Sequence, residues 1–219
     1  MKMNNCLFET PKISIITICY NSEKHLEETI QSVLRQSYKN KEYIIIDGGS
    51  TDGTMSIINK YRQQITYFVS EPDKGISDAF NKGIRAATGD VIGIINSDDV
   101  LEKEALNCMA REYDPSVDVY RGICKIWNDR TGFVFMEYPT LNWPTIPIKM
   151  RGAHPSTFVS RCAYERYGTY KIELRYVMDT DLFIRFSRNR AVVKYIPQVL
   201  ACFRLGGISQ SDEKNVPTS

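Results

Sequence analysis

The sequence has few of the residues from which zinc sites and disulfide frameworks are built. It contains two histidines and six cysteines, and no two cysteines form a CxxC pair. Isolated cysteines without histidines at ligand spacing are typical of reduced, mostly buried thiols. A zinc site or a set of structural disulfides is therefore not expected.

Long hydrophobic runs are also missing. No apolar stretch approaches the roughly 20 residues that a membrane-spanning helix needs, and residues 1–6 lack the apolar core of a signal peptide. We therefore expect a cytoplasmic protein. The net charge is only +2, but residues 140–204 contain 11 Lys or Arg against 4 Asp or Glu. This excess is either a solvated basic face or a surface that attracts phosphates or the anionic inner face of the cell membrane.

Apolar runs of strand length alternate with helical patterns in the first half of the chain. The expected strands cover residues 12–19, 42–47, 65–69 and 91–95, and the clearest helical pattern covers residues 76–87. Such alternation predicts a mostly parallel sheet with helices on both faces. After about residue 112 the pattern changes, and the runs 117–127 and 133–138 predict two strands joined by a hairpin-like connection.

Further expected elements follow the hairpin. They are an irregular proline-bearing loop at 138–147, strands at 155–160, 192–196 and 199–204, and helices at 161–167 and from residue 178. We expect one domain over residues 1–219, because the second half is too short and too dependent on strands of the first.

Carboxylates follow two of the predicted strands. Residues 89–95 read as a strand buried on both faces, and Asn96, Ser97, Asp98 and Asp99 follow it directly. Adjacent carboxylates at the carboxyl edge of a sheet repel each other unless a cation compensates them, and Mg²⁺ or Mn²⁺ accepts such ligands. The alternative is a turn that caps a helix beginning near Glu102. Asp47 ends another strand and is expected to face the same crevice.

Several motifs follow one another along residues 11–209, namely Ile15–Asn21, Ile46–Thr54, Glu71–Gly75 with Asn81–Gly83, Ile95–Asp99, Met178–Leu182 and Gly206–Ser209. Taken in this order, they resemble the family 2 glycosyltransferases with a GT-A fold, particularly those that build bacterial surface polysaccharides. The resemblance implies a GT-A (Rossmann-like) α/β fold, with a nucleotide-sugar-binding half at about 11–112 and a smaller β-rich acceptor-side half at about 113–210. Residues 211–219 are polar and are expected to be a disordered tail.

The resemblance also implies an activity. It is the inverting transfer of a sugar, UDP-linked in our expectation, from a nucleotide-sugar to the hydroxyl of a saccharide acceptor. The acceptor is expected to be lipid-linked, with no nucleic acid involved, and the sequence does not indicate an oligomeric state. The residues that the resemblance assigns to the nucleotide are Thr17, Tyr20, Asn21, Asp47, Asp78, Asn96 and Asp98. Asp98 and Asp99 are assigned to Mn²⁺ or Mg²⁺, and an Asx turn before Gly48 is the alternative for Asp47.

One position departs from the family pattern, and the role of general base has two candidates. Many family members have an acidic residue where this chain has Asn96, which brings an oxygen but no charge. The resemblance selects Asp179 as the general base, and helical spacing places it with Leu182, Phe183 and Phe186 while Asp181 points away. A helix cap is the alternative role for Asp179. His154, Asp181 and Arg204 are possible acceptor or diphosphate contacts, although a lone histidine is more often structural.

Competing functions are less consistent with these motifs. A dinucleotide-binding dehydrogenase needs a glycine-rich turn after its first strand, and this chain has Cys19–Ser22 there. A sugar-nucleotide pyrophosphorylase would resemble the fold but would have a glycine- and basic-rich loop near the N-terminus. A degenerate module that binds a nucleotide-sugar without catalysis remains the non-enzymatic alternative.

Overall fold

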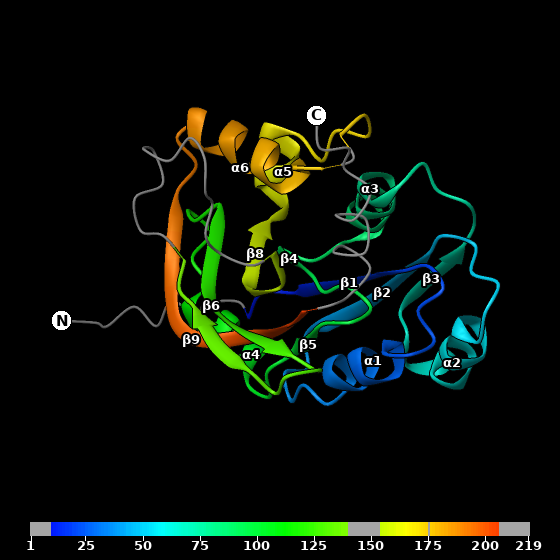
Figure 1. Ribbon diagram of the computed structural model, residues 1–219. Coiled ribbons are helices and arrows are strands. Elements are labelled where there is room, and N and C mark those ends of the chain that lie inside the picture. Colours follow the sequence, from blue (N-terminus) through cyan, green and yellow to red (C-terminus); the bar gives the residue numbers. More distant parts are fainter. Residues whose placement is uncertain (1–9, 140–153, 175, 206–219) are drawn as a thin grey trace, which may run out of the picture.

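The computed structural model describes residues 10–139, 154–174 and 176–205, and it has the predicted mixed α/β architecture. One nine-stranded sheet runs in the order β3-β2-β1-β4-β8-β6-β9-β5, and β7 pairs with β6. Helices α1, α2 and α4 lie on one face of the sheet and α3, α5 and α6 on the other (Figure 1). Within the described residues, no helix is both long and apolar enough to cross a membrane.

The first half of the chain forms the parallel part of the sheet. Its strands are β1 (Ile13–Cys19), β2 (Lys41–Asp47), β3 (Tyr67–Ser70) and β4 (Val91–Ile94). Its helices are α1 (Leu26–Leu34), α2 (Thr54–Lys60) and α3 (Ile76–Ala86), with a short 3₁₀ turn at Arg62–Gln64. Because β1, β2 and β4 carry apolar residues on both faces, each strand is buried almost throughout, as in parallel sheets covered by helices.

The second half adds mainly antiparallel pairings. Strands β6 (Val119–Asn128) and β7 (Val134–Glu137) form the predicted hairpin, and β8 (Thr157–Ser160) lies between β4 and β6. A 3₁₀ turn (His154–Ser156) precedes β8, and helices α5 (Arg161–Tyr167) and α6 (Met178–Arg188) follow it. The predicted closing motif at residues 206–209, the expected tail and most of the proline-bearing loop lie outside the described residues.

Two sequence-based expectations are wrong. The strands expected at 192–196 and 199–204 are one strand, β9 (Val193–Leu205), in which a register shift opposite Gly122 and Ile123 accommodates Pro197. A bulge suits proline because proline has no N–H to give to a ladder. The helix expected from Glu102 is α4 (Ala105–Glu112), and a short strand, β5 (Val100–Leu101), precedes it. Asn96–Asp99 therefore does not cap that helix.

The pairing of β5 with β9 brings two distant parts of the chain together at the carboxyl edge of the sheet. Val100 lies opposite Cys202, and Leu101 lies opposite Ala201. The end of the described chain is thereby brought against the turn that contains Asp98 and Asp99. The end of β9 therefore lies next to the polar turn at Asn96–Asp99, although the two are about 100 residues apart in the sequence.

Candidate functional site

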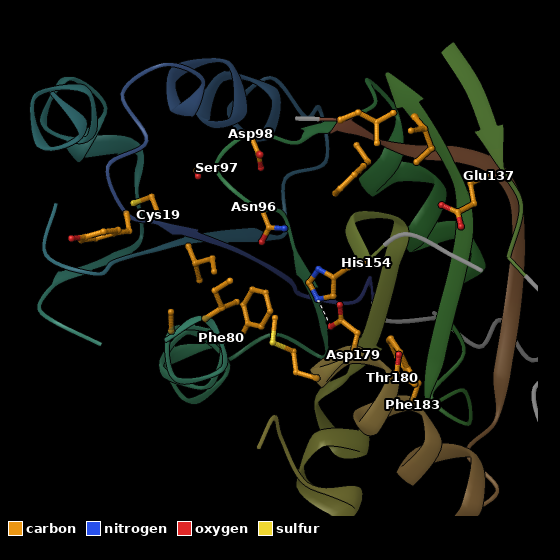
Figure 2. A pocket seen from close by; sticks show the side chains of 18 of the residues that line it. Cys19, Phe80, Asn96, Ser97, Asp98, Glu137, His154, Asp179, Thr180 and Phe183 are labelled. Carbon is orange, nitrogen blue, oxygen red and sulfur yellow. Dashed lines mark ion pairs between the residues drawn. The ribbon is translucent and has the colours of Figure 1, made fainter. Parts of the chain in front are cut away.

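A cavity of about 960 Å³ opens at the carboxyl edge of β1 and β4. Helix α3 and the first turn of α6 form one side, and β7 forms another (Figure 2). Tyr20, Asn96, Asp98, His154 and Asp179 line this cavity. Five residues of the resemblance's site assignment thus line one cavity.

The turn after β4 holds Asp98 and Asp99 in different surroundings. The backbone N–H of Asp99 donates to the Asn96 carbonyl at 3.1 Å and closes the turn. Asp98 is partly exposed and lines the cavity, whereas Asp99 is fully buried and does not. Burial raises the pKa of Asp98, and burial together with the Asp98 carboxylate raises the pKa of Asp99 well above its ordinary value.

Arg204 supports this turn from behind. Its backbone N–H donates to Asp99 Oδ1 at 3.2 Å, and its Nε donates to the Asp98 carbonyl at 3.1 Å. The guanidinium also donates to both carboxylate oxygens of Asp129 at 2.7 Å, and stacks over the Trp127 ring at 4.5 Å. Arg204 does not line the cavity, so its described contacts are with the protein.

The oxygens of the turn have the chemistry of a divalent-cation site. Among the described residues, Asn96 Oδ1 and Asp99 Oδ2 are buried without a hydrogen-bond partner, and the carboxyl of Asp98 is held in a site that disfavours its charge. A cation would relieve both conditions. No group of three or more His, Cys, Asp or Glu side chains suited to a metal occurs within the described ranges. Water and substrate phosphates would have to supply further ligands, as is common for Mg²⁺.

Asp47 and Thr17 are placed differently from the sequence-based expectation. Asp47 is fully buried and does not line the cavity. Its carboxylate accepts hydrogen bonds from the backbone N–H groups of Gly49 and Ser50 at 3.1 and 3.0 Å and from Ser70 Oγ at 2.6 Å. This is the Asx-turn arrangement given above as the alternative. Thr17 is also buried, and its hydroxyl accepts from Tyr43 at 3.1 Å.

Asn21 and Asp78 likewise do not line the cavity. Asn21 has a left-handed backbone with φ of 48°, and its Oδ1 accepts from the backbone N–H of Thr51 at 2.9 Å, which joins the loops after β1 and β2. Asp78 is buried on α3, where Oδ2 accepts from the Lys74 backbone N–H at 3.1 Å. Their described contacts order the loops around the site.

The first turn of α6 separates the two carboxylates that the sequence offered as bases. Asp179 lines the cavity, and its Oδ1 has no hydrogen-bond partner within the described residues. Asp181 instead accepts from Lys171 and Arg185, both at 2.8 Å. Burial raises the pKa of Asp181, but these two hydrogen bonds outweigh burial and hold that pKa below its ordinary value. The N-cap of α6 is Val177, so Asp179 does not occupy the cap position.

One residue behind the cavity wall and one part of the wall itself were not found from the sequence. One is Tyr170, whose hydroxyl lies 2.9 Å from His154 Nε2, while the same nitrogen lies 3.8 Å from Asp179 Oδ1 (Figure 2). The other is the end of β7, where Phe135, Met136 and Tyr138 line the cavity and are 43%, 42% and 60% exposed. The end of β7 could have been found from its exposed apolar run without polar alternation. No sequence pattern indicated Tyr170.

Comparison with known proteins places this geometry in a family. The model of "Glycosyl transferase family 2" matches residues 14–171. A "PGL/p-HBAD biosynthesis glycosyltransferase" of Mycobacterium bovis is 30% identical over 211 residues, which cover 92% of this chain and 80% of that protein. An uncharacterized glycosyltransferase of Rickettsia typhi is 27% identical and is matched over 84% of this chain and 61% of its own length.

Solved structures agree with the fold. The crystal structure of S. aureus TarS 1-349 aligns with a TM-score of 0.71 at 22% identity, over 88% of this chain and 60% of that one. A mannosyltransferase of Pyrobaculum calidifontis, in complex with GDP-Man and Mn²⁺, aligns with a TM-score of 0.65 at 18% identity, over 90% of this chain and 57% of that one. The fold is therefore that of the GT-A glycosyltransferases. Together with the match over most of the sequence, this shows that the chain belongs to glycosyltransferase family 2.

Proposed function

We propose that this glycosyltransferase moves a sugar from a UDP-linked donor to an acceptor hydroxyl with inversion at the anomeric carbon, in the assembly of a cell-surface glycan. One observation carries the proposal: a single cavity is lined on one side by Asn96 and Asp98 and on another by Asp179, whose Oδ1 is unpartnered among the described residues. The proposed metal-binding edge and a carboxylate that lines the same cavity are the two groups that inverting transfer needs.

The edge at Asn96 and Asp98 is where the donor's diphosphate would lie. Asn96 Oδ1 and the Asp98 carboxylate would hold Mn²⁺ or Mg²⁺, with Asp99 behind them as a buried support. When bound, the ion neutralises the diphosphate and so favours its departure as a leaving group. The aromatic ring of Tyr20, which is 55% exposed and lines the cavity, would stack on the base.

Asp179 is the proposed general base. Its carboxylate would take the proton from the acceptor hydroxyl as that oxygen attacks the anomeric carbon, on the side opposite the leaving diphosphate. Asp181 is unsuited to this task because Lys171 and Arg185 already engage both of its oxygens. Thr180 and Phe183 complete the wall next to Asp179 and would bound the acceptor.

Similar proteins support the proposed donor class, and the cavity wall supports the proposed acceptor class. TarS has been solved with UDP and with UDP-GlcNAc, which supports a uridine donor, while the mannosyltransferase binds GDP-Man. The apolar rim at Phe135, Met136 and Tyr138 favours an acceptor that carries an apolar portion. A lipid-linked saccharide reached at the inner surface of the cell membrane has this character. We include association with that membrane surface in the proposal.

The nucleotide part of the proposal is tested by a binding panel. UDP, GDP and ADP are titrated into the protein by calorimetry with and without Mn²⁺. We expect UDP to bind and the affinity to fall at least tenfold without Mn²⁺, since like charges at close range cost about 1–4 kcal/mol. Asp98→Ala should remove the Mn²⁺ dependence.

Asp114→Ala is the matched control, because Asp114 is an exposed carboxylate that does not line the cavity. Its UDP affinity should equal that of the wild type. Equal UDP binding by the wild type with Mn²⁺ and with EDTA would refute the metal assignment. Preference for GDP would correct the donor, and tight UDP binding without any transfer would favour the non-enzymatic module.

A further inference from the structure

A cluster of aromatic side chains adjoins Asp179 and has no task in the proposed reaction. The imidazole of His154 is stacked on the Phe80 ring, with centroids 5.1 Å apart and planes at 17°. His154 Nε2 lies 2.9 Å from the Tyr170 hydroxyl and 3.8 Å from Asp179 Oδ1. The same imidazole nitrogen thus faces both a buried phenol and the carboxylate of the proposed base.

Helix α3 fixes this cluster in place. The side chain of Asn81 clamps the backbone of Tyr170, because Asn81 Nδ2 donates to the Tyr170 carbonyl at 2.8 Å and the Tyr170 N–H donates to Asn81 Oδ1 at 3.0 Å. Phe80, the preceding residue on the same helix, supplies the ring on which His154 stacks. Stacking limits the tilt of the imidazole and the phenol limits its rotation. The edge that faces Asp179 is therefore fixed.

The phenol remains protonated. Burial, followed by the nearby Tyr164 hydroxyl and Asp179 carboxylate, raises the pKa of Tyr170 well above its ordinary value. Tyr170 therefore always has one hydrogen to donate, and its oxygen can also accept.

The position of Asp179 decides which way the hydrogen bond between His154 and Tyr170 runs. A lone pair on Nε2 would face the carboxylate and be repelled by it, whereas an N–H on Nε2 is attracted both to Tyr170 Oη and to Asp179 Oδ1. With the N–H on Nε2, His154 donates to Tyr170. The Tyr170 hydrogen is then left for the Asp179 carboxylate, the negatively charged group beside it.

We propose that His154, anchored by Tyr170, is a positioning residue for Asp179. This inference rests on the proposed role of Asp179 as the general base and extends that role. The N–H and O–H dipoles of the pair favour the ionised carboxylate and fix its rotation, so that the oxygen not engaged by the pair faces the acceptor. Without the pair, Asp179 remains in the cavity but samples other orientations. The reacting atoms are then misaligned in most complexes.

The kinetic test separates positioning from binding. His154→Ala should lower kcat for transfer about 10²-fold, the effect of a ~1 Å misplacement at a reacting centre, with KM for the donor unchanged. Imidazole added to the assay should restore part of the rate. His154→Gln, whose amide N–H reaches the position of Nε2, should stay within about tenfold of the wild type. Tyr170→Phe should lower kcat about tenfold.

Tyr38→Phe is the matched control for Tyr170→Phe. Its hydroxyl is buried and donates to the Pro11 carbonyl at 2.5 Å, and it does not line the cavity. This variant should lose stability without losing kcat. If His154→Ala raises the donor KM and leaves kcat unchanged, or if Tyr170→Phe behaves like Tyr38→Phe, the positioning role is refuted.

A spectroscopic test does not depend on activity. The chain has two histidines, so ¹⁵N-histidine labelling gives two imidazoles, and His25→Gln assigns them. The His154 signals should show the proton on Nε2 and should shift in Asp179→Asn and in Tyr170→Phe, while those of His25 should not. A proton on Nδ1 would overturn the inference. If these signals are as expected but the wild type transfers no sugar, the proposed function fails instead; if Asp179→Asn abolishes transfer while His154→Ala keeps its kcat, only the positioning role fails.

Discussion

Replacing Arg204 with methionine should weaken both the fold and the nucleotide site. The arginine side chain is 6% exposed and joins three parts of the chain, because it bonds to the Asp98 carbonyl, to Asp129 and to Glu28. Methionine keeps much of the length and the apolar contact with Trp127 but removes every side-chain donor, while the backbone N–H still bonds to Asp99. The Asp98 carbonyl then loses its hydrogen bond from the guanidinium.

The loss of unfolding free energy in Arg204→Met depends on how exposed the two carboxylate partners of Arg204 are. Breaking a buried ion pair costs about 3–5 kcal/mol, but the side chains of Asp129 and Glu28 are 29% and 52% exposed and can be rehydrated. We therefore expect a loss of about 3 kcal/mol in the free energy of unfolding. In a chain of this size that loss lowers Tm by about 6–12 °C.

Urea unfolding and calorimetric UDP titration in Mn²⁺ measure the two effects. Arg204→Met should also bind UDP about tenfold more weakly, since the Asp98 backbone is no longer held. Arg166→Met is the control: the Arg166 side chain is 60% exposed and solvent screens its ion pair with Asp118, so its loss should destabilise the protein far less than the loss of Arg204. If Arg204→Met is as stable as Arg166→Met and binds UDP like the wild type, the supporting role of Arg204 is wrong.

Two further predictions concern stability and the acceptor. Burial raises the pKa of Glu42, but hydrogen bonds from Lys12 and Ser14 among others outweigh it and hold that pKa at about 2. A lowered folded-state pKa stabilises the protein above the unfolded value of 4.5, and the gain is lost as the pH falls toward 2. Glu42→Gln should therefore cost about 2–3 kcal/mol at pH 7 in urea unfolding, with the difference shrinking below pH 5; a difference that does not change with pH would contradict this. Phe135→Ala should raise the acceptor KM without changing UDP affinity, whereas Phe133→Ala, just before the same strand and not lining the cavity, should change neither; equal acceptor KM values in both variants would argue against an acceptor wall at β7.

Local pattern was sufficient to predict much of the architecture. Buried strands such as β1, β2 and β4 appear in the sequence as apolar runs, and their polar ends necessarily meet at one edge of a parallel sheet. The helical repeat in α6 also predicted that Leu182 and Phe183 are buried and that Asp179, not Asp181, faces the cavity. Each of these inferences depends on residues close together in the chain.

The features that were missed depend on distant partners. Asp47 ends a strand as predicted, but the Ser70 hydroxyl and the loop N–H groups of Gly49 and Ser50 occupy its oxygens. Strand β5 has two residues and exists because β9, about 100 residues later, pairs with it. Tyr170 contacts His154 because α3 holds both residues in place. No spacing between residues in the sequence predicts this contact.

The most direct test of the account compares transfer by Asp179→Asn and Asp181→Asn. Both variants remove one carboxylate from the same helix turn, but only Asp179 lines the cavity. With a UDP-sugar, Mn²⁺ and an acceptor, Asp179→Asn should bind UDP like the wild type and transfer sugar ~10²- to 10⁴-fold more slowly. Asp181→Asn should lose stability through Lys171 and Arg185 but keep its transfer rate. Wild-type transfer by Asp179→Asn, or its loss in Asp181→Asn alone, would contradict the account.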